Sequence, residues 1–293
     1  MELIRGLHNM RPRHRGCVVT IGAFDGVHLG HQAVIRHLLQ KSAELEVPSV
    51  VIVFEPLPRE YFAPIEAPAR IMSFREKFYA LRALGVDRLM RLRFNEQLRT
   101  MSAQQFLDDI FVGGLGVRYI VLGDDFRFGN DREGDLEFIK EQGRRYGYRA
   151  GPTPTESIDG ERVSSTRIRR ALEAADFAEA ERLLGRPYSI SGKVIYGRQL
   201  GQTIGTPTAN LELRRLRAPL SGVYAVEVSG AGLEAAWGVA NVGVRPTIDD
   251  SIKANLEVHL LDREIGLYGQ HIEVTFRHKL RDEQKFETME ELM

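Results

Sequence analysis

The sequence predicts a two-domain protein: an α/β domain built on a parallel sheet with helices on both faces, followed by a small antiparallel β-barrel. Up to about residue 185, continuous apolar runs alternate with segments of helical spacing, as expected of strands buried on both faces. From about residue 186, short strand-like segments separated by glycines dominate, which is typical of barrels. The length of 293 residues also fits two domains.

The first half supplies the predicted parallel strands. We place them at residues 17–21, 49–54, 88–94 and 119–122, and we predict a helix over 75–84 with Gly85 as its C-cap. Ligands bind beyond the carboxyl ends of such strands. Residues 22–31, 55–58 and 123–129 follow strands directly, so we expect the site among them.

The second half supplies the predicted barrel. Its strand-like segments are residues 188–196, 222–228, 235–242, 255–261 and 271–276, and a last helix is expected near Thr288. We place the junction at Gly185, Arg186 and Pro187. The predicted domains are therefore residues 1–185 and 186–293.

Composition limits the functional classes. The formal net charge is zero, which argues against a broad nucleic-acid footprint. The single cysteine, Cys17, lies in a predicted core strand and cannot form an internal disulfide. The amino-terminal residues have no apolar signal-like region, and no apolar run approaches about 18 residues. We therefore expect a cytoplasmic protein without a membrane span.

Two histidines mark the most informative segment. His28 and His31 follow a glycine-rich turn at the predicted start of a helix, where free backbone N–H groups and the helix dipole favour an anion. This indicates a phosphate site. Zinc is an alternative, but it needs a third and a fourth ligand.

A second segment, residues 162–170, combines hydroxyls with arginines. One interpretation is a helix capped by Ser165 or Thr166 with a solvated basic face. The other adds polyphosphate recognition by the guanidinium groups.

Two further segments lie in the barrel half. Residues 201–210 form a predicted turn-rich loop before a strand, in which Thr208 and Asn210 are candidates to hold Mg²⁺. Glu257 and His259 share one face of a predicted strand, and Glu257 is a candidate general base. Residues 241–247 are either a plain turn or a loop closing on substrate, and residues 281–286 are either a charged surface or a ligand contact.

Together these segments resemble the bacterial bifunctional riboflavin kinase/FMN adenylyltransferase family. The resemblance runs from about residue 16 to 292 and includes the segment 22–31 with its HxGH motif, the segment 123–129, SSTxxR at 164–169, PTAN at 207–210, and the segments 238–241 and 267–269. It implies a Rossmann-like nucleotidyltransferase domain followed by a six-stranded barrel kinase. It also implies ATP, riboflavin and FMN as small-molecule partners, with Mg²⁺ as cofactor and FAD as product.

The resemblance also implies residue roles. His28, His31 and Arg162 would stabilise the transition state of adenylyl transfer, Glu257 would be the kinase base, and Thr208 and Asn210 would hold Mg²⁺. The residues expected to contact ATP or flavin are Gly22, Phe24, Asp25, Gly30, Asp125, Ser165, Thr166, Arg169, Gly205, Pro207, Asn241 and Arg245. The chain is expected to be a monomer or a weak homo-oligomer.

The chain departs from the family pattern in two places. Thr206 stands where the family usually has Phe, and relatives usually continue beyond the segment matching residues 290–292. The alternative function is therefore an FAD-forming adenylyltransferase whose kinase domain is impaired and mainly binds flavin. A different nucleotidyl transfer, a flavin-binding regulator and a nucleic-acid module are less well matched by the motifs.

Overall fold

The computed structural model describes the whole chain except residues 124–125, 197–207, 247–251, 262–265 and 285–293. The chain forms two compact units. The first contains residues 1–67 and 77–163, and the second contains residues 68–76 and 164–293. Helices α7 and α8 thus group with the barrel.

The first unit is built on a six-stranded parallel sheet in the order β1-β4-β3-β2-β5-β6. Its strands are β1 (Glu2–Arg5), β2 (Val18–Ile21), β3 (Ser49–Phe54), β4 (Arg88–Leu92), β5 (Tyr119–Leu122) and β6 (Arg149–Pro152). Every residue of β2 and β3 is buried. The continuous apolar runs therefore mark strands covered on both faces, as predicted.

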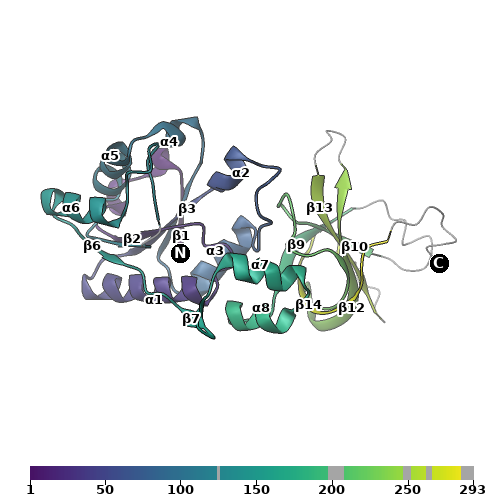
Figure 1. Ribbon diagram of the computed structural model, residues 1–293. Helices are drawn as coiled ribbons and strands as arrows, with labels where there is room; N and C mark the ends of the chain where they lie inside the picture. The colour runs from purple at the N-terminus through teal and green to yellow at the C-terminus, as the bar shows by residue number, and fades with distance from the viewer. Residues whose placement is uncertain (124–125, 197–207, 247–251, 262–265, 285–293) are drawn as a thin grey trace. The chain divides into compact units, whose positions relative to one another are not determined.

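Helices cover both faces of this sheet (Figure 1). Helix α1 (Leu29–Glu44) packs against β2, β3 and β5. The opposite face carries a core cluster that includes Phe106 and Phe111, from α5 (Ala103–Phe106) and the π-helical segment η3 (Leu107–Gly114) that continues it. The remaining helices and short strands are η1 (Leu7–Asn9), η2 (Pro12–His14), α2 (Pro58–Phe62), α3 (Phe74–Ala83), α4 (Glu96–Thr100), α6 (Leu136–Tyr146), β7 (Ser157–Ile158) and β8 (Glu161–Arg162).

The strand order creates a switch point between β2 and β5. The chain runs from β2 through β3 to β4 on one side, and then returns to β5 on the other side of β2. Connections that diverge in this way leave a crevice at the carboxyl ends of the two strands, where ligands of open sheets bind. The two-histidine segment follows β2 and therefore begins at this point.

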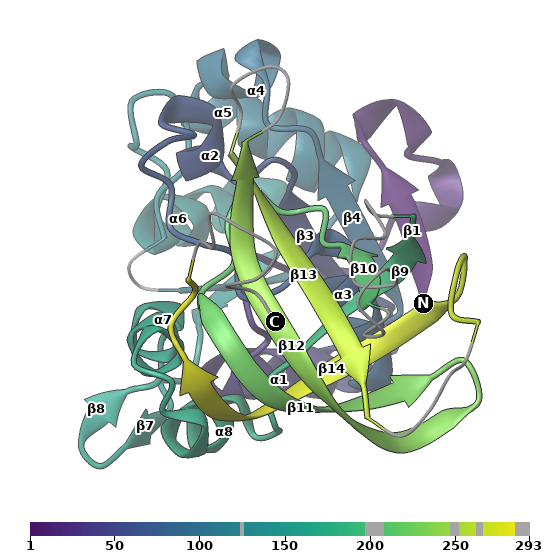
Figure 2. The ribbon, with the colours of Figure 1, turned by 90° about the vertical axis from the view of Figure 1, so that its right-hand side faces the viewer.

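The second unit contains a closed barrel in the order β10-β13-β12-β11-β14-β9 (Figure 2). Its strands are β9 (Ser189–Ile195), β10 (Thr208–Glu212), β11 (Gly222–Gly230), β12 (Leu233–Pro246), β13 (Ile252–Leu260) and β14 (His271–Arg281). Alternate residues such as Tyr224, Val226 and Val228 are buried. The six-stranded antiparallel barrel is confirmed, although β11 to β14 extend further than predicted.

Two helices precede the barrel, α7 (Ser165–Glu173) and α8 (Phe177–Leu184). The Phe177 ring lies 5.8 Å from the Tyr224 ring and 6.1 Å from the Phe276 ring, so α8 extends the aromatic core. Segment 68–76 is tied to the barrel by a buried ion pair, Arg215 to Glu76 at 2.6 Å. The carboxylate of Glu76 also accepts a 2.7 Å hydrogen bond from the Ser191 backbone N–H.

Candidate functional site

The turn after β2 has an unusual backbone. Phe24, Gly26 and Val27 have φ values of 47°, 89° and 41°, all in the left-handed region. That region is a genuine outlier for a β-branched residue such as Val27. For residues other than glycine, here Phe24 and Val27, such conformations cost about 1–3 kcal/mol each and cluster at functional sites. The turn therefore lowers the stability of the fold while its backbone is held in one defined conformation.

His28 and His31 are brought together by this turn. His28 is the N-cap of α1, and its Nδ1 accepts a 3.3 Å hydrogen bond from the His31 backbone N–H. The two rings stack with centroids 3.6 Å apart, and the Phe24 ring lies 5.0 Å from His31. Because Nδ1 of His28 is an acceptor, its neutral ring carries the proton on Nε2 and can donate from there.

The electrostatic environment keeps His31 neutral. Burial lowers the pKa of His31 well below 6.5, and the charges of Lys77, Arg162 and, when it is protonated, His28 lower this pKa further. The Nδ1 atom of His31 is buried with no hydrogen-bond partner among the described residues. An anion that binds here would be attracted by the neighbouring positive charges and could form a hydrogen bond with the imidazole of His31.

Gly30 lies where no side chain fits comfortably. A Cβ at this position would be 3.2 Å from the His28 ring and 3.2 Å from the Val163 backbone oxygen. The backbone at Val163 therefore packs closely against the start of α1 at Gly30. This contact accounts for the glycine between the two histidines.

The hydroxyl-rich segment begins α7 one residue earlier than predicted. The N-cap is Ser164, whose Oγ accepts from the Arg167 backbone N–H at 3.2 Å, rather than Ser165 or Thr166. Ser165 and Thr166 are instead the first two helical residues. Arg169 donates from Nε to the Ala69 carbonyl at 2.6 Å, so this guanidinium is partly engaged by the protein itself.

In the barrel, a polar row crosses three neighbouring strands. Asn210 on β10 pairs with Glu257 on β13, and Glu257 pairs with Asn241 on β12. The row lies on the outer face, because flanking residues such as Leu211 and Leu256 are buried in the interior. The Oδ1 atoms of Asn210 and Asn241 are both buried with no hydrogen-bond partner among the described residues. We call Asn210, Glu257 and Asn241 the outer row.

The outer row has the donor set for a hard divalent cation. Thr208 lies two residues before Asn210, on the same face of β10 rather than in the predicted loop. A hydroxyl, an amide oxygen and the carboxylate of Glu257 are the oxygen ligands that Mg²⁺ prefers. Within the described ranges, no group of three or more His, Cys, Asp and Glu side chains is placed to hold a metal ion.

Sequence reasoning missed three features of these sites. Asn255 donates from Nδ2 to Glu257 Oε1 at 3.0 Å, a contact that i, i+2 spacing on a strand permits. Lys77 is only 1% exposed, although lysine is almost never fully buried. An aromatic cluster follows β3 and β4, in which Phe62 contacts Tyr61 and Phe94 while remaining 62% exposed.

Other predicted site residues are placed as follows. Gly22 follows β2, and Asp25 is buried in the turn. Arg162 lies on β8 and Arg245 on β12. Asp125, Gly205 and Pro207 lie outside the described residues, as do Thr206 and the predicted last helix.

Comparison with known proteins decides the family. The FAD synthetase family model matches residues 10–167, and the riboflavin kinase model matches residues 184–293. A bifunctional riboflavin kinase/FMN adenylyltransferase from Pseudomonas fluorescens is 53% identical over 100% of this chain and 93% of that protein. The chain belongs to the bifunctional riboflavin kinase/FMN adenylyltransferase family. The member from Escherichia coli K12 is 47% identical over the same shares.

A solved structure shows the same fold as this riboflavin kinase/FMN adenylyltransferase family member. A crystal structure described as a macrolide-efflux protein from Streptococcus pneumoniae superposes with a TM-score of 0.77 at 30% identity, over 100% of this chain and 95% of that one. Among the described residues, no helix is both long and apolar enough to cross a membrane.

Proposed function

We propose that the outer row of the barrel carries the riboflavin kinase reaction of this family and that the turn after β2 carries FMN adenylyl transfer. The observation that supports the first assignment best is the outer row itself, where a carboxylate lies between two amide oxygens that have no hydrogen-bond partner in the part of the chain that the structure describes. The stacked histidine pair in the strained turn supports the second.

In the kinase reaction, the terminal ribityl hydroxyl of riboflavin attacks the γ-phosphorus of ATP. Glu257 accepts the hydroxyl proton, the bond to the bridging oxygen breaks, and FMN and ADP are formed. Thr208 and Asn210 would hold Mg²⁺, which neutralises charge on the phosphates. Asn255 is a positioning residue, because its amide holds Oε1 of Glu257 and thereby orients the carboxylate toward the hydroxyl.

In the adenylyl transfer, a phosphate oxygen of FMN attacks the α-phosphorus of a second ATP. The bond between the α-phosphorus and the bridging oxygen breaks, so FAD forms and pyrophosphate leaves. No protein nucleophile is required. His28, His31 and Arg162 stabilise the charge that develops, and the buried ammonium of Lys77 adds to the positive field. The exposed ring of Phe62 offers the flat flavin a stacking surface.

Two variants test the assignments separately. Glu257→Gln keeps the shape of the side chain but cannot accept a proton, so FMN formation from riboflavin is expected to fall about 10²–10⁴-fold. FAD formation from supplied FMN should be unchanged. His28→Ala should lose FAD formation by about 10²–10³-fold and keep FMN formation. Chromatographic separation of the flavins measures both, and a folded variant that loses both activities would refute the two-site assignment.

An impaired kinase is not favoured, because the residues of the outer row are all present. The finer assignments to Mg²⁺, the cytoplasm and a monomer or weak homo-oligomer remain part of this proposal. Replacing Mg²⁺ by Ca²⁺ in the kinase assay checks the first of these. Mg²⁺ requires compact octahedral coordination whereas Ca²⁺ does not, so Ca²⁺ should support less FMN formation.

A further inference from the structure

A polar hollow lies along one edge of the parallel sheet in the first unit. Strand β1 is the outermost strand, so among the described residues it has a neighbouring strand on one side only. Residues 7–14, which contain η1 and η2, return along its other side, where Asn9 contacts Arg5 and His14 contacts Glu2. The cavity between this segment and β1 has a volume of about 240 Å³, which has room for several water molecules. We call it the edge hollow.

The backbone of β1 turns two N–H groups toward the edge hollow. Glu2 and Gly6 donate their N–H groups to carbonyls in or next to β4, at 2.8 and 2.9 Å. Because strand residues face their two sides alternately, Leu3 and Arg5 face away from β4. The Arg5 carbonyl accepts a 2.7 Å hydrogen bond from Nδ2 of Asn9, which fixes this direction. The N–H groups of Leu3 and Arg5 have no hydrogen-bond partner among the described residues.

Positive charge is in excess around the edge hollow. Arg5, Arg11 and Arg13 line it, and Glu2 is the single acid among the described residues that do so. Arg13 pairs with Glu2 at 2.8 Å, and hydrogen bonds from Arg13 and His14 lower the pKa of Glu2, which keeps this carboxylate ionised. Neither Arg5 nor Arg11 has a carboxylate partner among the described residues. Two of the three arginine charges are therefore not neutralised within the hollow.

We propose that the edge hollow binds a small dicarboxylate, with one carboxylate at the Leu3 N–H and the other at the Arg5 N–H. These donors are two residues apart on a strand, which corresponds to about 7 Å. The oxygens of one compact anionic group do not span that distance, whereas a molecule with an anionic group at each end does. Its two negative charges match the two arginine charges in excess, and guanidinium groups bind carboxylates through paired hydrogen bonds.

This site is separate from the turn after β2 and from the outer row. Strands β4 and β3 lie between β1 and β2 in the sheet, and the outer row belongs to the second unit. Loss of dicarboxylate binding therefore leaves the two proposed reactions untouched, and failure of either reaction leaves the edge hollow intact.

The amide signals of Leu3 and Arg5 in nuclear magnetic resonance test the site directly. The full chain, without nucleotide or flavin, is titrated with glutarate, with pentanoate, which has a methyl group in place of one carboxylate, with inorganic phosphate, and with chloride at matched ionic strength. We expect saturable shifts of both signals with glutarate. Pentanoate and phosphate should bind about tenfold more weakly, because each leaves one charged group without its hydrogen bond. Chloride should give no saturable shift, and the amide of Ile4, which faces β4, is the internal reference.

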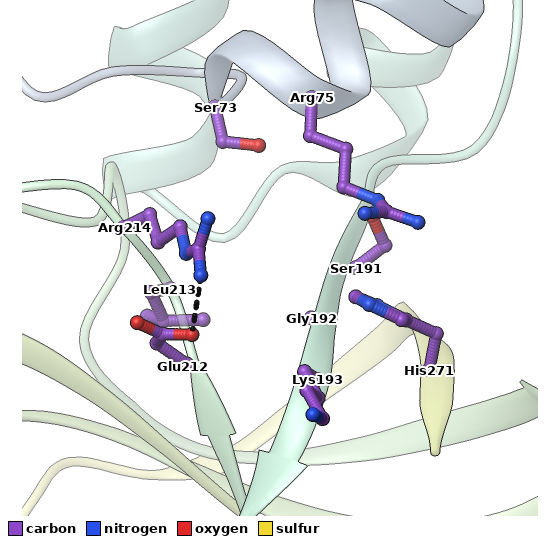
Figure 3. Close-up of a pocket in the computed structure, with 9 residues that line it drawn as sticks. All are labelled: Ser73, Arg75, Ser191, Gly192, Lys193, Glu212, Leu213, Arg214 and His271. Atoms are coloured by element: carbon purple, nitrogen blue, oxygen red, sulfur yellow. Dashed lines mark ion pairs between the residues drawn. The ribbon is translucent and has the colours of Figure 1, made fainter. Parts of the chain in front are cut away.

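Matched variants show where the dicarboxylate binds. Arg5→Gln combined with Arg11→Gln removes both charges in excess and should abolish glutarate binding. Leu3→Pro removes an N–H that β4 does not use, a position where an edge strand accepts proline, and should weaken binding about tenfold. The control is Lys193→Ala, which removes an exposed cation from a polar hollow on the barrel (Figure 3) and should leave glutarate binding intact. Formation of FMN and of FAD at the parent rates reports that each variant is folded.

Four results would overturn the proposal. The first two are pentanoate or phosphate binding as tightly as glutarate, since one anionic group would then be enough. The third is glutarate binding that survives in the double arginine variant. The fourth is a saturable response that spares the amides of Leu3 and Arg5, because the ligand would then lie elsewhere.

Discussion

The turn after β2 and the outer row of the barrel create polar sites in opposite ways. The turn relies on backbone conformation, with three residues at positive φ within four positions and a glycine that no larger residue can replace without displacing a neighbour. The outer row relies on ordinary antiparallel register, which places Asn210, Glu257 and Asn241 side by side. The first site should therefore be sensitive to backbone changes, and the second to changes of single polar side chains.

The largest expected effect of a backbone change falls on the turn. In Gly30→Ala, the added methyl group must displace the His28 ring or the Val163 carbonyl, each 3.2 Å away. The neighbours must move by a few tenths of an ångström. Because a displacement near 1 Å can cost about 10²-fold in rate, FAD formation from FMN should fall by about 10- to 10²-fold. FMN formation from riboflavin is the internal control and should not change. An adenylyl-transfer rate equal to that of the parent chain would show that the tight fit is not needed.

A substitution in the outer row should affect the free energy of unfolding and the rate of FMN formation differently. Asn210→Leu removes a buried oxygen that has no partner among the described residues. Such a group costs about 1–3 kcal/mol when unsatisfied, so the free energy of unfolding should hold steady or rise. FMN formation should nevertheless fall, because a proposed metal ligand is lost. Urea denaturation and the kinase assay measure the two quantities, and a large loss of stability would indicate a structural role instead.

A smaller effect is expected at Asn255. Asn255→Ala should lower the kcat of FMN formation by about tenfold, the scale of one hydrogen bond to a charged group, and leave the KM for ATP unchanged. The same substitution in a Glu257→Gln background should have little further effect, because Asn255 acts through Glu257. Asn255→Ser, which retains a donor, should recover part of the rate. Equal losses in both backgrounds would contradict the positioning role.

The smallest effect concerns pH. Because the folded protein holds the pKa of His31 well below 6.5, the unfolded chain binds more protons near that value. This contribution to stability is therefore full above pH 6.5 and is lost progressively as pH falls toward the folded pKa. Denaturation between pH 7.5 and 5 should show a steeper loss for the parent chain than for His31→Gln. Identical slopes would show that His31 is not buried in its neutral form.

Local sequence signals predict much of the local structure around both candidate sites. Strand, turn and helix around His28 and His31 are encoded within about twenty residues, so their order was predictable. The position of Glu257 on an outward face followed from the alternation of side chains along a strand. The cap of α7 was harder to predict, because Ser164, Ser165 and Thr166 are all competent N-caps and tertiary contacts decide among them.

Other features depend on contacts between distant segments. The burial of Lys77 and the register that brings Asn210 beside Glu257 join residues far apart in the chain, so local patterns do not specify them. Segment 68–76 groups with the barrel unit, to which the Arg215–Glu76 ion pair ties it. The local sequence around Glu76 does not indicate that its partner is Arg215.

The central claim is that the two reactions occur at separate sites, and complementation tests it most directly. His28→Ala and Glu257→Gln are each incubated with riboflavin, ATP and Mg²⁺, alone and mixed, and the flavins are separated by chromatography. The account predicts FMN without FAD for the first variant, unchanged riboflavin for the second, and FAD for the mixture, because FMN released by one variant is a substrate for the other. A mixture of two folded variants that makes no FAD, or a single variant that makes FAD from riboflavin at the parent rate, would contradict it.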